Sequence, residues 1–358
     1  MKMKRIEWVD RVRAFAMISV VLGHALGQIN EDVFLNRWLY LFHVPLCVII
    51  SGYLFKEKDN LKQSMNYVKK ILIREYIPYL FWGFFSIVVY LIVIDHSNLM
   101  TNAANFLKGL FFGNGSLGRG SGDKGYMVWN TPLWYLPCII VIEFISAFLS
   151  LIKFKYSKAV IFACSIALAF SCYHFLNLHI WFMEFESAIY LLPFFWFGMV
   201  LREGEVFIDR LLKNKIIVIA FSVFLIAAGS VVGFINGSPI YLTDVYRSSY
   251  ILFAVSAALI GMGIMELERG LAYRSRPVAY IGRNTMTLLV FHKFPIMVAS
   301  MFISKLLKVK VTNEPLIVVV GIVITVIAVA VSLVAAVLFT KAAPVLIGKT
   351  RNKKRFSK

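Results

Sequence analysis

Arg13 and His24 lie eleven residues apart near the start of the chain, a spacing that could bring both side chains to one face of a helix. Eleven helical residues turn through about 1100°, so the two positions fall within about 20° of each other and roughly 16 Å apart along the axis. Residues 14–30 are apolar enough to enter a bilayer, and His24 lies among them. Ionisable groups at such depth are costly, which makes them functional candidates. We therefore expect a cation near the membrane edge and a proton acceptor near its middle, with a catalytic or transport role. The alternative is that His24 only makes a hydrogen bond between helices.

The composition is that of a polytopic membrane protein, with 59% hydrophobic residues, 16% charged residues and a mean hydropathy of +0.76. We expect an all-α integral membrane protein, a single transmembrane domain over 1–358 with both termini cytoplasmic. At about 20 residues per crossing, about ten apolar stretches are long enough to span or nearly span the hydrocarbon. The predicted spans are 14–30, 38–55, 75–95, 133–152, 159–177, 187–201, 216–235, 248–265, 284–304 and 316–340.

The formal charge of +19 suggests nucleic-acid binding at first sight, but the positions of the charges argue against it. With ten spans and cytoplasmic termini, roughly three quarters of the 38 lysine and arginine residues fall on the inner side, as the positive-inside rule requires. The basic surface would then face anionic lipid headgroups of the bilayer and an anionic cytosolic ligand. We expect no nucleic-acid partner.

Two further histidines occupy apolar sequence. His43 precedes Pro45 near the outer end of the second span, and His292 lies about two turns into the ninth. From the cytoplasmic side His292 lies roughly 12 Å beyond Asn284, so both His24 and His292 could approach the midplane. A polar cavity lined by spans one, two and nine would shelter all three histidines. For His43 and His292 a structural hydrogen bond and a direct role remain equally open.

Other polar residues in the spans have simpler interpretations. Glu143 is predicted to be a buried carboxylate paired with a helix-end cation rather than a catalytic acid, and Lys293 to extend along an apolar neighbour. Arg74 is either a positive-inside anchor or a phosphate ligand beside the Pro-kinked third span. Gly52 most simply permits close helix approach. In the cavity, Arg74 and Arg283 would sit at the inner mouth and Trp134 at the outer one.

Two patterns resemble binding motifs but fail on context. The four cysteines lie within predicted spans without C-x-x-C spacing, so we expect small core residues and neither a metal site nor a disulfide framework. Gly113 to Gly118 formally matches G-x-G-x-x-G, but the motif neither follows a strand nor opens a helix of a βαβ unit. It is predicted to be a flexible loop in the long outer gap 94–132, or an outer lid that contacts an acceptor.

Several of these segments together resemble the acyltransferase-3 family of integral membrane acyltransferases, over about residues 5–292. The resemblance is closest to the branch that O-acetylates sugars of bacterial surface polysaccharides, including fucose 4-O-acetylase-like members. The first two matching segments are the most specific. The matching segments are Asp10-Arg11-Val12-Arg13 with His24, Phe42 to Leu46 with Ser51 to Leu54, Pro132 to Leu136, and Ile281 to Thr285 with His292.

The resemblance implies transfer of an acetyl group from cytosolic acetyl-CoA to a carbohydrate hydroxyl, in the bacterial inner membrane. It assigns the catalytic roles to His24 and Arg13. Supporting positions would be Asp10, His43, Ser51, Trp134, Glu143 and His292. Donor-binding positions would be Arg74, Lys70, Arg283 and Asn284.

The chain departs from the family pattern in two respects. Members often show Arg-x-x-Arg before the third-span proline, and here Ile71 occupies the first position with Lys70 beside it, which weakens the donor contacts. Many relatives carry an extracytoplasmic esterase-like domain. Since this sequence contains none, a separate extracytoplasmic partner protein could supply that function.

The mechanism implied is general-base catalysis, in which the neutral imidazole of His24 takes the proton of the acceptor hydroxyl. We favour direct transfer over an acyl-enzyme. Arg13 would either hold CoA phosphates or pair with Asp10 one turn away. The main alternative is a proton-coupled transporter or flippase, which the same buried charges would suit. A scaffold without a ligand would leave those charges without a purpose.

Overall fold

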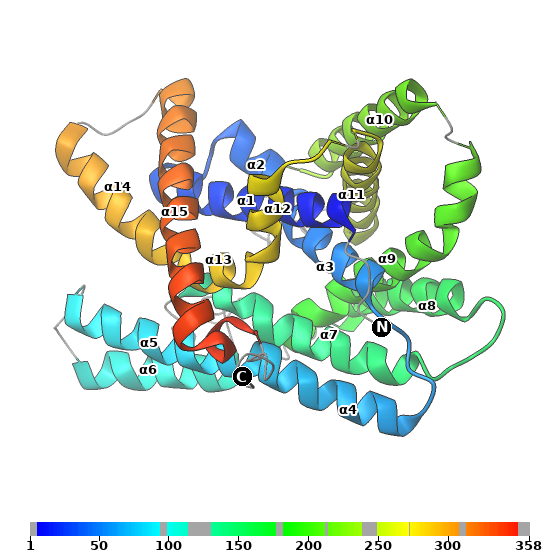
Figure 1. Cartoon of the computed structure of the whole chain (residues 1–358), viewed down its shortest axis with the longest axis horizontal. Helices are drawn as coiled ribbons and strands as arrows, with labels where there is room; N and C mark the ends of the chain where they lie inside the picture. The colour runs from blue at the N-terminus through cyan, green and yellow to red at the C-terminus, as the bar shows by residue number, and fades with distance from the viewer. Residues whose placement is uncertain are drawn as a thin grey trace, which may run out of the picture.

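The computed structural model of the chain describes residues 6–93, 99–113, 130–176, 182–211, 214–237, 249–271, 273–307 and 313–349. Every regular element in these ranges is helical (Figure 1). The first helices are α1 (Glu7–Ile29), α2 (Phe34–Tyr40), α3 (His43–Leu54), α4 (Leu61–Ile71), α5 (Ile77–Val93), α6 (Leu99–Phe112), α7 (Tyr135–Leu149) and α8 (Ser157–Ser171). They are followed by α9 (Phe185–Leu211), α10 (Lys215–Ile235), α11 (Tyr250–Leu271), α12 (Arg276–Arg283), α13 (Thr285–Phe291), α14 (Lys293–Leu307) and α15 (Glu314–Ala342).

The described residues contain nine helical segments long and apolar enough to cross a membrane, and a tenth if the bent pair α13–α14 counts as one span. The prediction of an all-α polytopic membrane protein with about ten transmembrane helices is thereby confirmed. The ten segments follow the predicted order along the chain. The segments are Glu7–Ile29, Phe34–Leu54, Leu61–Val93, Thr131–Leu149, Ser157–Phe175, Phe182–Glu205, Lys215–Ile235, Tyr250–Leu271, Thr285–Phe291 with Lys293–Ile303, and Glu314–Ala342.

Several predicted spans differ from the observed ones at their ends: the first begins at Glu7 rather than at residue 14, and the eighth ends at Leu271 rather than at residue 265. The sixth, predicted over 187–201, runs from Phe182 to Glu205, because α9 continues through polar residues at its C-terminal end and a 3₁₀ turn, Phe182–Glu184, precedes it. The third, predicted to begin at residue 75, is preceded without a break by α4. Exposed lysines on α4 gave that segment too little hydrophobicity to count as part of a span.

The long outer gap 94–132 contains a helix that the sequence analysis did not predict. This helix, α6, lies beside α5 (Figure 1), where the Tyr79 hydroxyl donates to the Leu110 carbonyl over 2.6 Å and Tyr90 packs on Phe106. Gly113 follows α6 with a φ of +74°, a conformation that suits glycine. The rest of the Gly113–Gly118 motif lies outside the described residues, so the lid interpretation stays a prediction.

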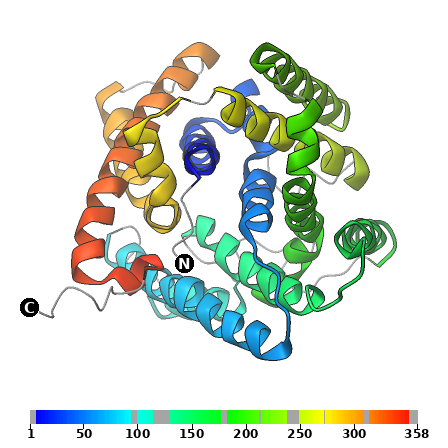
Figure 2. The same cartoon turned by 45° about the vertical axis from the view of Figure 1, so that its right-hand side comes forward.

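Helix α1 lies at the centre of the bundle. Figure 2 views it nearly end on, and the other helices surround it. It contacts α3, α11, α12, α13, α14 and α15, and small buried residues such as Ala14, Ala16 and Ala25 allow these neighbours to come close. A side chain on the inner face of α1 therefore points into the protein rather than into lipid.

Helices α3 and α9 cross with their backbones in contact through two glycines. A Cβ added to Gly52 would overlap the Phe195 carbonyl, and one added to Gly198 would overlap the Ile49 carbonyl. The close approach predicted for Gly52 is confirmed, and Gly198 supplies the matching position on the partner helix.

Candidate active site

His24 faces the interior of the bundle from α1. Its ring is half-buried and lies 5.3 Å from the His292 ring, measured between centroids. His43 and Lys293 are close enough for their charges to act on the His24 ring. Within the part of the chain that the structure describes, His24 forms no hydrogen bond. Its two ring nitrogens therefore remain available to a ligand.

Prolines break the two spans that carry the other histidines. Pro45 follows the break between α2 and α3, where His43 is the first residue of α3. Pro295 follows the break between α13 and α14, which are bent by 52° at His292. A proline lacks the backbone N–H and clashes with the carbonyl four residues earlier, so the helix bends just before it.

Both of these histidines use the same nitrogen to bond to their own helix. His43 Nδ1 donates to the Leu39 carbonyl over 2.7 Å, and His292 Nδ1 donates to the Leu288 carbonyl over 2.6 Å. Because a carbonyl only accepts, Nδ1 carries the proton and Nε2 holds the lone pair in each neutral ring. The structural hydrogen bond considered for both residues is present, and it leaves one nitrogen of each ring free of that bond.

The segment that leads into α7 fastens the break at His292. Asn130 Nδ2 donates to the Val290 carbonyl over 2.9 Å, and the Lys293 ammonium donates to Thr131 Oγ1 over 3.1 Å. Thr131 begins the 3₁₀ turn Thr131–Trp134, in which Trp134 is half-buried. The predicted outer-mouth residue Trp134 thus belongs to the segment that holds the His292 break in place.

A chain of polar neighbours connects α1, α3 and α7 on the side of Arg13. Arg13 is half-buried, and its charge acts on the Cys47 thiol of α3. Ser51 donates from Oγ to the Cys47 carbonyl over 2.9 Å and lies close enough to the Tyr135 hydroxyl of α7 to interact with it. Ser51 was expected to support the site, whereas Tyr135 belongs to the Pro132–Leu136 segment of the resemblance but was given no role of its own.

The start of α1 is anchored by Arg11, a residue to which the sequence analysis assigned no role. Its guanidinium is buried, donates to Glu268 Oε2 over 2.8 Å and to the Tyr273 carbonyl over 2.7 Å, and lies 4.5 Å over the Tyr273 ring. The neighbouring Asp10 is also buried, and the predicted Asp10–Arg13 pair stays a prediction.

Arg74 is held between two buried carboxylates. It lies in the π-helical turn Leu72–Tyr76, four residues before Pro78, and donates to Glu75 Oε1 (2.9 Å from Nε) and to Glu143 Oε2 (2.5 Å from Nη2). The Tyr67 hydroxyl donates to the same Glu143 oxygen over 2.9 Å. Glu143 thus has the cationic partner that was predicted for it. Since the Arg74 charge is already balanced, phosphate binding there would need further cations.

Lys58 is a cation beside this cluster. Its ammonium lies 3.9 Å over the Tyr67 ring and 4.2 Å over the Phe55 ring. Burial lowers the pKa of Lys58 to about 8, and the Glu143 carboxylate acts in the opposite direction. Lys70, the exposed lysine predicted to bind the donor, lies near enough for its charge to act on Lys58.

The remaining predicted donor ligands meet the C-terminal segment. Asn284 is buried, donates to the Tyr280 carbonyl and accepts a hydrogen bond from the Lys349 ammonium over 2.8 Å. Arg283 is exposed and lies 5.7 Å over the Tyr280 ring. Gly348 packs on the Arg74 carbonyl, which the Pro78 ring leaves without its usual helical partner. Lys349 is therefore a basic group near both Asn284 and Arg74, and no motif in the sequence indicated it.

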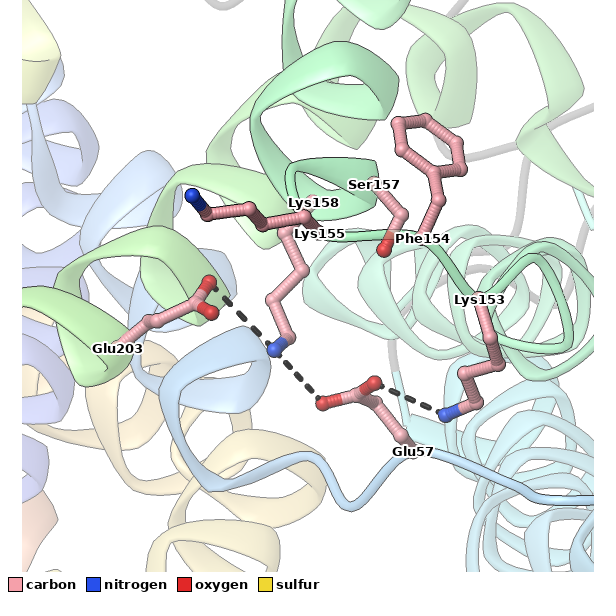
Figure 3. A pocket seen from close by; sticks show the side chains of 7 residues that line it. All are labelled: Glu57, Lys153, Phe154, Lys155, Ser157, Lys158 and Glu203. Atoms are coloured by element: carbon pink, nitrogen blue, oxygen red, sulfur yellow. Dashed lines mark hydrogen bonds and ion pairs between the residues drawn. The ribbon is translucent and has the colours of Figure 1, made fainter.

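A separate surface pocket lies where the α3–α4 and α7–α8 connections meet α9 (Figure 3). Lys153 and Lys158 contact Glu57 at 2.9 and 3.0 Å, and Lys158 also contacts Glu203 at 3.4 Å. None of the predicted site residues lines this pocket. Its lysines are largely balanced by the two glutamates, so we interpret the network as a surface link between helices.

The central helix α1 carries His24 and the half-buried Arg13. The His292 imidazole and the Lys293 ammonium lie beside the His24 ring. In comparisons with known proteins, the acyltransferase domain of the acyltransferase-3 family matches residues 6–338. No curated protein and no solved structure matches the chain. Since the match covers nearly the whole sequence, the chain belongs to the acyltransferase-3 family of membrane acyltransferases.

Proposed function

We propose that this membrane acyltransferase moves an acetyl group from cytosolic acetyl-CoA to a hydroxyl of a cell-surface carbohydrate, either a polysaccharide or its lipid-linked precursor. The observation that carries the proposal is the state of His24. Its ring faces the bundle interior and is half-buried, and among the described residues it has no hydrogen-bond partner. An imidazole in that state can accept a proton from a bound hydroxyl.

The reaction needs one proton acceptor and one site of positive charge. The hydroxyl oxygen attacks the thioester carbonyl while its proton passes to His24, and a tetrahedral oxyanion forms. The C–S bond then breaks, and the departing thiolate takes the proton back from the imidazolium. Lys293, whose charge acts on the His24 ring, would stabilise the oxyanion in surroundings where little water competes.

Arg13 would serve the donor from the predicted cytoplasmic side. It lies on the same helix as His24, eleven residues before it, and its side chain is half-buried rather than locked in the interior. A guanidinium can bind a phosphate of CoA through two parallel hydrogen bonds. Further contacts to acetyl-CoA at the same end of the bundle would come from Asn284, Arg283, Lys70 and Lys349.

The site of action follows from the same proposal. The protein would be a multi-pass component of the bacterial inner membrane, with the donor on the cytosolic side and the carbohydrate on the outer side. A separate extracytoplasmic protein would receive or present the acceptor.

The test is transfer of label from radiolabelled acetyl-CoA to an acceptor glycan by the purified protein. We expect the wild-type protein to transfer the label. His24→Ala should lower the turnover at least 10²-fold while leaving membrane insertion and elution on size exclusion unchanged. Near-normal turnover by His24→Ala would remove the proposed base. Counterflow of unmodified solute without label transfer would favour the transporter or flippase considered as the alternative.

A further inference from the structure

His292 presents a buried hydrogen-bond acceptor that no described residue uses. The side chain is 0% exposed, and Nε2 has no hydrogen-bond partner among the described residues. Its Nδ1 is occupied by the Leu288 carbonyl, which fixes the lone pair on Nε2 in the neutral ring. An unpaired buried acceptor costs free energy, so it calls for a donor in the working enzyme.

The nearest ring available to supply that donor is His24. The centroids of the two rings are 5.3 Å apart and their planes are inclined by 32°. Two imidazoles joined edge to edge by an N–H···N bond have centroids roughly 5 Å apart, given a nitrogen–nitrogen distance of about 3 Å. Hydrogen bonds of catalytic groups are often poorly aligned without substrate and tighten when it binds.

We infer that His292 is a positioning residue, whose Nε2 accepts the N–H of one His24 ring nitrogen and so directs the lone pair of the other nitrogen toward the acceptor hydroxyl. The inference rests on the proposed role of His24 as the base. It gives His292 the task that a carboxylate has in a Ser-His-Asp triad, where the third residue fixes the tautomer and orientation of the imidazole.

The surroundings of His292 hold it in place for this task. His292 lies at the bend between α13 and α14, three residues before Pro295. The residues on either side of His292 are held by hydrogen bonds. Asn130 donates to the Val290 carbonyl, and the Lys293 ammonium donates to Thr131. Together with the bond from Nδ1 to the Leu288 carbonyl, these two contacts fix the position of a ring whose Nε2 has no partner among the described residues.

Two substitutions distinguish the role of Nε2 of His292 from the role of Nδ1. In His292→Gln the amide oxygen can occupy the place of Nε2, so an acceptor for His24 is kept while the bond to Leu288 is lost. In His292→Asn the amide N–H can still bond to the Leu288 carbonyl, but no acceptor reaches His24. A purely structural role predicts that Asn restores function better than Gln.

The inference predicts the reverse order in the acetyl-transfer assay. We expect kcat of His292→Gln to stay within about tenfold of wild type, and kcat of His292→Asn to fall about 10²-fold with KM for acetyl-CoA unchanged. Both variants should elute on size exclusion like wild type. Equal activity of the two folded variants, or greater activity of the Asn variant, would overturn the inference.

A second measurement does not depend on turnover. In protein labelled with ¹⁵N-histidine, the protonated and unprotonated ring nitrogens give separate signals, which His24→Ala assigns to His24. We expect one His24 tautomer in wild type and in His292→Gln, and a mixture in His292→Asn. The same tautomer ratio in all three would contradict the inference. A wild-type protein without acetyl transfer but with this tautomer pattern would reject the proposed function alone.

Discussion

Arg11 and Arg13 are two residues apart on α1, yet their surroundings give them different tasks. Arg11 is buried and hydrogen-bonded to Glu268 and to the Tyr273 carbonyl. Its charge is therefore balanced by Glu268, and these bonds link α1 to α11. Arg13 is half-buried and lies beside Cys47, on the helix that carries His24. We therefore propose that Arg13, rather than Arg11, binds a donor phosphate.

This difference predicts different effects of the same substitution. Arg13→Lys keeps the charge but loses the paired hydrogen bonds of the guanidinium, which are worth about 1.5–3 kcal/mol. We expect kcat/KM for acetyl-CoA to fall about 10-fold to 10²-fold, mainly through KM, with thermal stability unchanged. Steady-state kinetics at varied acetyl-CoA measures both parameters.

Arg11→Lys is the matched control for this prediction. It removes the bonds to Glu268 and to the Tyr273 carbonyl, so the melting temperature should fall while KM for acetyl-CoA stays the same. If Arg13→Lys keeps the wild-type KM, only the charge of Arg13 matters, and phosphate binding through paired hydrogen bonds is wrong.

At the scale of elements, α3 and α9 depend on two small residues for their contact. The backbones meet at Gly52 and Gly198, where an added Cβ would overlap a carbonyl of the other helix. A backbone carbonyl cannot move aside as a flexible side chain can. The position of α3 matters for the site because α3 carries His43, Cys47 and Ser51.

Gly198→Ala should therefore destabilise the protein by about 3 kcal/mol, at the upper end of the range for an overpacked core. Thermal unfolding of the purified protein in detergent measures the effect. Gly204→Ala on the same helix is the control, because nothing lies within 4 Å of its added Cβ. That control should be neutral or more stable by up to about 1 kcal/mol, from helix propensity. A melting temperature equal to wild type for Gly198→Ala would contradict backbone contact between α3 and α9 at this position.

The order of the helices could be predicted from sequence because each span carries its own signal. Hydrophobicity marked ten stretches, and Pro45 and Pro78 marked places where the regular helix is interrupted. The limits were less predictable, since polar residues at the ends of α9 and the short helix α6 fall outside any hydrophobic window.

The site could be predicted only in part, because its contacts join residues far apart in the chain. His24 and Arg13 share one helix, so their spacing alone related them. The contact between His24 and His292 depends on how α1 packs against α13 and α14, and no local pattern encodes it. The contacts of Asn130, Arg11 and Lys349 likewise join segments far apart in the chain, so no local pattern could indicate them.

At the scale of the whole molecule, the proposal requires one orientation in the membrane. The donor must enter from the cytoplasm beside Arg13, and the acceptor must come from the opposite face. The distribution of lysine and arginine predicts this orientation, with the α1–α2 connection outside and the α11–α12 connection inside. Asp32 and Arg274 mark these two connections, with side chains 57% and 88% exposed.

Single cysteines at these two positions test the orientation directly. We expect a membrane-impermeant maleimide to label Asp32→Cys in intact cells, and Arg274→Cys only after the membrane is permeabilised. The unsubstituted protein is the control for the four native thiols, of which Cys138 and Cys172 are buried. Labelling in the opposite order would place Arg13 on the outer side, away from cytosolic acetyl-CoA. The direction of transfer would then have to be reversed, even if His24 and His292 act as proposed.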